Sequence, residues 1–97
     1  MDDEIERLRR EQFDKVMAYL AKRFVDKNRA KGDAFMTVVS GIDDAFSEVE
    51  ATLKPIESMK KFSSASFDIE EYKKKLADLA IYTILNIMWI EEHKEIF

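Results

Sequence analysis

Helix-breaking residues are scarce in this sequence, which has only two glycines and one proline among 97 residues. Between these breakers, apolar residues recur at steps of three and four, the spacing that gathers side chains on one face of an α-helix. Runs of β-branched residues, which would favour strands, are short. We therefore predict an all-α fold, a bundle of three main helices that forms a single domain over residues 1–97.

The first helix is expected from about Asp3 to Lys27, followed by a loop at residues 28–33. Asn28 and Gly32 favour a turn there, and the Asp33 carboxylate is suited to accept hydrogen bonds from the first N–H groups of the next helix. The apolar positions of the first helix step mainly by three and four residues and are Ile5, Leu8, Phe13, Val16, Met17, Leu20 and Phe24.

The second helix is expected to keep Gly41 in its interior and to be kinked or broken near Pro55, with a break at Lys54, because proline lacks the N–H of a helical hydrogen bond. Its apolar stripe consists of Phe35, Val38, Val39, Ile42, Ala45, Phe46, Val49 and Leu53. A serine-rich connection at 60–68 follows. Asp68 and Glu71 have the spacing of a capping box, which predicts a last helix that runs to about His93.

Residues 76–90 of the last helix are apolar on two faces. About 20 apolar residues are needed to span a bilayer, so this stretch of about 15 predicts a buried helix and no membrane contact. One face holds Tyr72, Leu76, Leu79, Ala80, Thr83, Ile87 and Ile90, and the other holds Ile81, Tyr82, Leu85, Met88 and Trp89. A three-helix monomer covers one face of each helix, so we expect the second face to pack on another subunit in a homo-oligomer, most simply a dimer.

The composition excludes several other classes of protein. No cysteine is present, so disulfides and thiolate chemistry are excluded, and a cytoplasmic location is expected from this and from an acidic N-terminus that does not resemble a secretory signal. Basic residues alternate with acids at a formal net charge of -4, which does not favour nucleic-acid binding. The only histidine, His93, lies in a charged run and is expected on the solvated surface.

Asp78 is a carboxylate at the edge of this apolar helix, where an unpaired charge would be costly. One interpretation is an ion pair with Lys74, one helical turn earlier. The other is a divalent-cation site that Asp78 shares with Asp44 and Glu48, which stand four residues apart on the second helix. Mg²⁺ is often held by a few carboxylates together with substrate phosphates.

Two segments carry a resemblance to a known family. The stretch "KNRAKGDAF" at 27–35 and the stretch "DLAIYTILNIMWIEE" at 78–92 resemble the nucleotide-modification-associated domain 1 family of phages and bacteria. That family is similar in layout to the all-α nucleoside-triphosphate pyrophosphohydrolases of MazG type. The resemblance implies a nucleotide bound by Lys27, Asn28 and Tyr82, with Mg²⁺ as cofactor.

The sequence departs from these families at Lys75, which replaces a metal-binding acid of the pyrophosphohydrolases, and at Ala30 and Lys31, which replace an acid and a tyrosine. Two functions follow. One is Mg²⁺-dependent binding or pyrophosphohydrolysis of a nucleoside triphosphate at a degenerate site made by Asp44, Glu48 and Asp78. The alternative is a non-catalytic helical homo-oligomer that serves as a protein-interaction module, of a kind that a virus or phage could encode.

Overall fold

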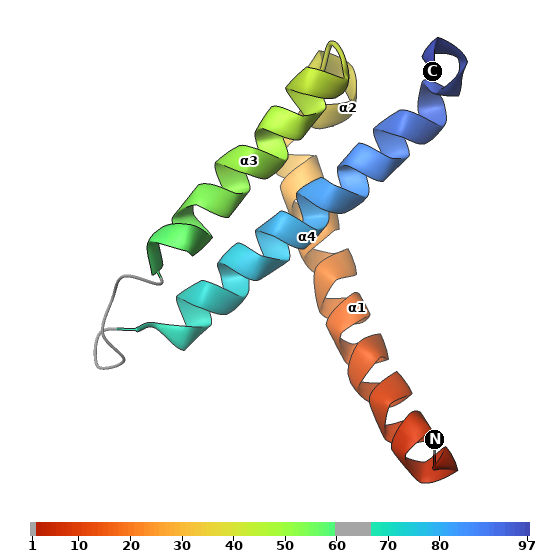
Figure 1. Cartoon of the computed structure of the whole chain (residues 1–97), viewed down its shortest axis with the longest axis vertical. Helices are drawn as coiled ribbons and strands as arrows, with labels where there is room; N and C mark the ends of the chain where they lie inside the picture. Colours follow the sequence, from red (N-terminus) through yellow and green to blue (C-terminus); the bar gives the residue numbers. More distant parts are fainter. Residues whose placement is uncertain (1, 60–66) are drawn as a thin grey trace. The chain divides into compact units, whose positions relative to one another are not determined.

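The chain is all-α, as predicted, in a computed structural model that describes residues 2–59 and 67–97. These described ranges contain three long helices, one short helix and a 3₁₀ turn at Lys94–Ile96, and Figure 1 shows their course. The helices are α1 (Asp3–Lys31), α2 (Ala34–Val38), α3 (Ile42–Met59) and α4 (Ile69–Glu92). The chain divides into two compact units, of which the first contains α1 and ends at Gly32, and the second runs from Asp33 to Phe97.

Helix α1 is longer than the sequence predicted. It begins at the Asp2 cap, whose carboxylate accepts the Glu4 N–H at 3.0 Å. It continues through Asn28 to Lys31 and ends where Gly32 adopts a left-handed conformation (φ 61°) and donates its N–H to the Asn28 carbonyl. The end expected at Lys27 is therefore wrong, because the left-handed glycine, a common helix terminator, lies four residues beyond Asn28.

The predicted second helix is split into α2 and α3. Asp33 is also left-handed (φ 62°), and its side chain makes no capping hydrogen bond, contrary to the prediction. Val39 is extended and ends α2, whereas the Gly41 carbonyl accepts the Ala45 N–H that opens α3. Gly41 thus lies just before a helix and not inside one, where a glycine would cost about 1 kcal/mol relative to alanine.

Helix α3 continues through Pro55, so the break predicted at Lys54 is wrong. Proline removes one backbone hydrogen bond from a helix interior, yet Ile56 directly after it is buried. The burial of this side chain holds the last turn of α3 in helical geometry, because tertiary packing contributes most of the stability of helices in proteins.

The start of α4 matches the prediction at Asp68. Its carboxylate accepts the N–H groups of Glu70 and Glu71, both at 3.1 Å, and the helix ends at Glu92 with His93 as its cap. Of the predicted serine-rich connection, residues 60–66 lie outside the described part of the chain. No helix in the described ranges has both the length and the apolarity needed to cross a membrane.

Helices α3 and α4 lie antiparallel and form a hairpin whose facing sides contain the buried core (Figure 1). Small residues, Ala45 and Ala77, occupy one core position on each helix. The buried apolar side chains are Ala45, Ile56, Ala77, Ile81, Leu85 and Trp89.

The face of α4 that was predicted to meet a partner is buried within the chain, and residues of the face that was predicted to be buried are exposed. Ile81, Leu85 and Trp89, expected at a subunit contact, are buried within the chain, and Trp89 is only 2% exposed. Leu76, Ile87 and Ile90, expected in the core, are exposed. Both faces are apolar in sequence, and the arrangement of α3 and α4 determines which one is buried. Exposed Met88 and half-buried Tyr82 remain predicted contacts of a partner.

Candidate functional site

Asp44, the first proposed metal ligand, lies in the first turn of α3. Its carboxylate accepts the Ser40 N–H at 3.0 Å and lies 3.4 Å from the Ser40 hydroxyl. These contacts tie the chain before α3 to the first helical turn, as side-chain caps do. A carboxylate held in this way already has a structural role at the helix start.

Glu48 and Asp78 are half-buried on α3 and α4, and both belong to the second unit. Thr52 donates its hydroxyl to the main-chain carbonyl of Glu48 at 2.7 Å. Within residues 2–59 and 67–97, no three Asp, Glu, His or Cys side chains gather into a group that could hold a metal ion. The predicted magnesium site therefore receives no support from the described side chains.

Lysines 73 and 75, which precede Asp78, pair with acids of the first turn of α4. The Lys73 Nζ lies 3.9 Å from the Glu70 carboxylate, and the Lys75 Nζ lies 3.5 Å from the Glu71 carboxylate. Exposed pairs of this kind contribute about 0–1 kcal/mol each. Lys75, which replaces a metal-binding acid of the pyrophosphohydrolases, thus has a local partner on its own helix.

The predicted nucleotide-binding residues belong to both units. Lys27 and Asn28 are half-buried on α1, and Tyr82 lies on α4 in the second unit. The Tyr82 ring packs against Phe35 of α2, with ring centroids 5.9 Å apart and planes tilted by 54°. This geometry lies in the range preferred by aromatic pairs. Tyr82 therefore helps to hold the short helix α2 against α4.

Asn86 joins the two helices of the hairpin, a role that the sequence analysis missed. Its side-chain amide donates to the Ala45 carbonyl of α3 at 3.1 Å and to the Tyr82 carbonyl one turn earlier at 2.8 Å. Ala45 is completely buried, so its carbonyl lies in the core of the hairpin. The sequence signal for this role was a single amide side chain within an apolar helical stretch. An amide that is buried there needs hydrogen-bond partners, which indicates a contact with a neighbouring helix.

An aromatic cluster closes the C-terminal end of α4. The His93 ring stacks on Trp89, with centroids 4.2 Å apart and planes 18° apart, and Phe97 meets the Trp89 ring edge-on at 6.3 Å. His93 Nδ1 lies 2.8 Å from the Trp89 carbonyl, which can only accept, so Nδ1 carries the proton. His93 is half-buried, and its predicted place on the solvated surface is corrected to a packing role.

Trp89 also carries a polar group inside this cluster. Within the described part of the chain, its buried indole N–H has no hydrogen-bond partner. An unsatisfied buried donor typically costs about 1–3 kcal/mol. The large apolar area of the buried indole, which packs against His93 and Phe97, offsets that cost in the hairpin.

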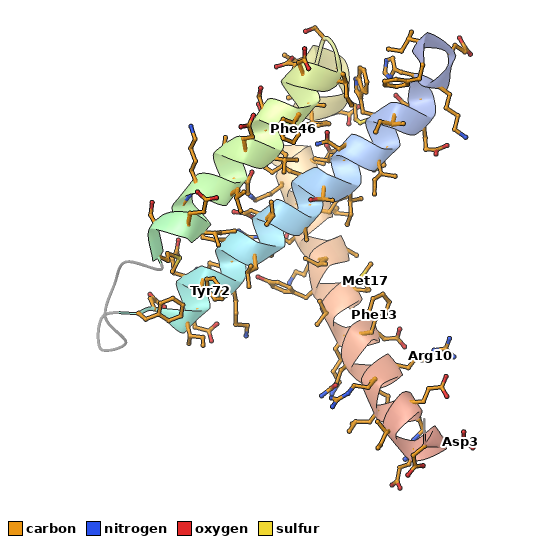
Figure 2. The ribbon with its side chains drawn as sticks, in the orientation of Figure 1. Asp3, Arg10, Phe13, Met17, Phe46 and Tyr72 are labelled. Atoms are coloured by element: carbon orange, nitrogen blue, oxygen red, sulfur yellow. The ribbon has the colours of Figure 1, made fainter. Side chains whose placement is uncertain are left out.

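Helix α1 presents the largest apolar surface of the first unit. None of its residues is buried, and Figure 2 shows Phe13 and Met17 projecting from the helix. We define the α1 apolar stripe as its predicted apolar positions, Ile5, Leu8, Phe13, Val16, Met17, Leu20 and Phe24. Phe13 is 62% exposed and Val16 is 54% exposed. Leu20 and Phe24 are half-buried, and the other members of the stripe are exposed and available to a second surface.

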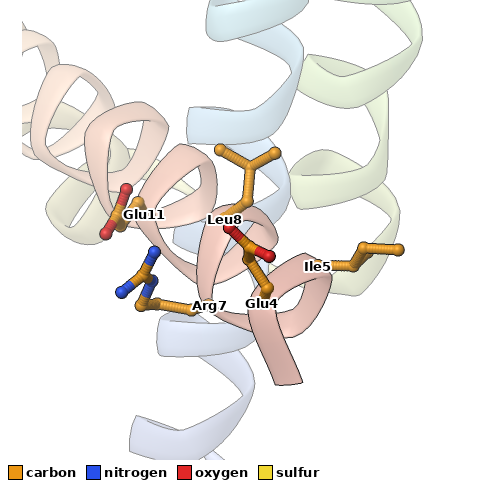
Figure 3. A pocket seen from close by; sticks show the side chains of 5 residues that line it. All are labelled: Glu4, Ile5, Arg7, Leu8 and Glu11. Carbon is orange, nitrogen blue, oxygen red and sulfur yellow. The ribbon is translucent and has the colours of Figure 1, made fainter. Parts of the chain in front are cut away.

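Two hollows lie along α1, between its long side chains. One, of about 270 Å³, is lined by Glu4, Ile5, Arg7, Leu8 and Glu11, which all project from the first turns of the helix in Figure 3. The other, of about 260 Å³, is lined by Tyr19, Lys22, Arg23, Asp26 and Lys27. Each is lined by residues of one helix, so flexible side chains determine its shape.

Comparison of the chain with protein-family models, with curated proteins and with solved structures gave no match. The resemblance to nucleotide-handling families therefore remains a prediction from the two segments that carry it.

Proposed function

We propose that the chain is a non-catalytic helical homo-oligomer that acts as a protein-interaction module through helix α1. The observation that carries this proposal is a 29-residue helix without a single buried residue, along which large apolar side chains are exposed. A single helix lacks a second surface to cover its apolar face, so most helices depend on packing against another element for their stability.

The energetic gain from covering the α1 apolar stripe is large. Full burial of one Val, Leu, Ile, Phe or Met side chain contributes about 1.5–3 kcal/mol. The exposed members of the stripe are Ile5, Leu8, Phe13, Val16 and Met17. Association must also overcome the loss of rotational and translational freedom, and several such side chains together offset that cost.

The polar candidates of the second unit support a structural role over a catalytic one. Asp44 holds the chain before α3, Tyr82 packs on Phe35, and Asn86 links α3 to α4. Each of these side chains already serves the fold. A catalytic residue, in contrast, must have a group directed at substrate with a partner that orients it.

Light scattering of the full chain over a range of concentrations tests the proposal. The chain has a mass of 11.4 kDa, and we expect a larger particle that dissociates on dilution. A Phe13→Asp substitution should shift the particle to the mass of one chain, because it places an unpaired charge in a desolvated contact. Particles of 11.4 kDa at every concentration would contradict the proposal.

Ala18→Asp is the matched control, because Ala18 lies on the opposite, polar side of the same helix and is exposed. Both substitutions add one carboxylate to the middle of α1 and lower its helix propensity. Only the change in the stripe should alter the particle mass. If Phe13→Asp and Ala18→Asp change the particle mass equally, the cause is loss of the helix. That result would remove the support for a contact through the α1 apolar stripe.

Mg²⁺-dependent nucleoside-triphosphate binding is a second candidate function, favoured by the hollow that Lys27 lines together with Lys22, Arg23 and Tyr19. Cationic side chains beside an aromatic ring suit a phosphate and a base. A ligand at about 100 times its Kd stabilises the folded state by about 2.7 kcal/mol, which a thermal-shift measurement detects. A magnesium nucleotide should raise the Tm, and Lys22→Gln with Lys27→Gln, which removes two cations that line the hollow, should remove that rise. An unchanged Tm would contradict this candidate alone.

A further inference from the structure

We propose that the partner of α1 is the α1 helix of a second copy of this chain, packed antiparallel to it. This inference rests on the proposed function, because it identifies the surface and the geometry of the homo-oligomer. It assigns the contact to the α1 apolar stripe, whereas the sequence pattern pointed to Ile81, Leu85 and Trp89 of α4. Those three side chains are buried within the chain and are already covered.

The charge distribution along α1 argues for the antiparallel orientation. Residues 2–11 include five acids and three bases, whereas residues 22–31 include five bases and one acid, so the two ends have net charges of -2 and +4. A parallel pair would place two ends of net charge -2 beside each other and two ends of net charge +4 beside each other. An antiparallel pair places each acidic end beside a basic end, and such complementarity favours one orientation over the other.

The two ends of α1 act independently of each other. A helix of 29 residues is about 44 Å long at about 1.5 Å per residue, whereas the Debye length is about 8 Å at physiological ionic strength. Each end therefore interacts with the end that lies beside it and not with the charges at the far end. The same distribution also matches the dipole of each helix, with acids at the N-terminus and bases at the C-terminus.

The middle of α1 fits a symmetric crossing. Residue 17 is the midpoint of Asp3–Lys31, and the segment 16–21 that surrounds it contains no charged residue. Val16 and Met17 are exposed there. A two-fold axis near this segment would place Val16 and Met17 of both copies in one apolar contact and would align each acidic end with a basic end. A symmetric contact of this kind uses the same patch on both copies.

Distances between spin labels in the full chain test the orientation. The sequence has no cysteine, so an Ala30→Cys substitution supplies one labelling site near the C-terminal end of α1 without changing its charge. An antiparallel pair crossing near residue 17 should separate the two labels by about 40 Å, the scale of one helix length. A parallel pair should bring them within about 20 Å, since packed helices lie about 8–10 Å apart.

Val16→Asp provides an independent measurement, with Ala18→Asp as its control. The first substitution is expected to raise the Kd of self-association at least about tenfold, and the second to change it less than about threefold. The antiparallel α1 contact would be overturned if the labels at Ala30→Cys lie close together, or if Val16→Asp leaves the dimer intact. The proposed homo-oligomer would still stand in either case. A chain that is monomeric at all concentrations would overturn both.

Discussion

Helices α1 and α4 are similar in length, 29 and 24 residues, but only α4 contains buried side chains. Both carry apolar residues at helical spacing, although α1 is the more polar of the two helices. The helices also differ in what lies beside each of them within its own unit. Helix α4 has α3 as an antiparallel neighbour, whereas α1 is the only helix of the first unit. Helical patterning creates an apolar face, and a second element is needed to bury it.

Removal of one aromatic side chain from each helix should show this contrast most strongly. We expect Trp89→Ala to lower the free energy of unfolding of the second unit by about 3–5 kcal/mol, because it deletes a large buried side chain and leaves a cavity. Phe13→Ala removes a ring that is 62% exposed and should cost less than about 1 kcal/mol below the concentration of self-association.

Urea denaturation followed by far-UV circular dichroism measures both changes. The helix signal of α4 and of α3 should be lost together in Trp89→Ala, since they share one core. If Phe13→Ala in dilute samples is as destabilising as Trp89→Ala, the contrast between a self-sufficient hairpin and a partner-dependent α1 is wrong.

Asn86 sharpens the comparison, because it is a polar link between the two helices of the hairpin. We expect Asn86→Ala to destabilise the second unit by about 1–3 kcal/mol, since the buried Ala45 carbonyl loses a donor from the other helix. Thr83→Ala is the control, because Thr83 is exposed and its hydroxyl donates to the Leu79 carbonyl of its own helix.

Thermal unfolding of these two variants gives the result. For a domain of this size, a change of about 1 kcal/mol shifts the Tm by roughly 4–8 °C. A Tm of Asn86→Ala equal to that of Thr83→Ala would show that the interhelical hydrogen bond does not contribute to stability.

The smallest expected effect concerns the boundary between the two units. Gly32 has a φ of 61°, so an added Cβ is strained there although no atom lies within 4 Å of its position. Gly32→Ala should cost about 1–2 kcal/mol and should fray the last turn of α1. Gly41→Ala is the control, since Gly41 also has open space around it but no positive φ.

Amide hydrogen exchange locates the effect of Gly32→Ala. Faster exchange in residues 28–32, with unchanged exchange in α4, would match the expected loss of the Gly32 to Asn28 cap. Equal protection in the Gly32 and Gly41 variants would show that the left-handed glycine is not what terminates α1.

Local features of this protein were readable from its sequence. The all-α class followed from apolar spacing and from the scarcity of glycine and proline, and Asp68 marked the start of α4. Capping depends on residues within one helical turn, so a short stretch of sequence contains the information. The prediction of a break at Lys54 was wrong for the opposite reason, because the burial of Ile56 in the tertiary structure outweighs the local effect of Pro55.

The candidate site depended on longer-range information. Asp44, Glu48 and Asp78 were chosen by spacing, and only the described arrangement shows that no group of three ligands forms in it. Asn86 was passed over, because its partner lies 41 residues away at Ala45. The spacing of side chains on one helix says where they point on that helix, and it does not say which side chains of another helix they meet.

The sequence by itself determined that this chain forms helices, where α4 begins, and that α1 carries an acidic start, an uncharged middle and a basic end. The tertiary structure alone decided that Ile81, Leu85 and Trp89 form the core while Leu76, Ile87 and Ile90 remain exposed. The two faces of α4 are both apolar, so their sequences favour burial of either. In the observed orientation of α4, the Asn86 side chain reaches the Ala45 carbonyl of α3. This contact between residues far apart in the sequence favours burial of the face with Ile81, Leu85 and Trp89.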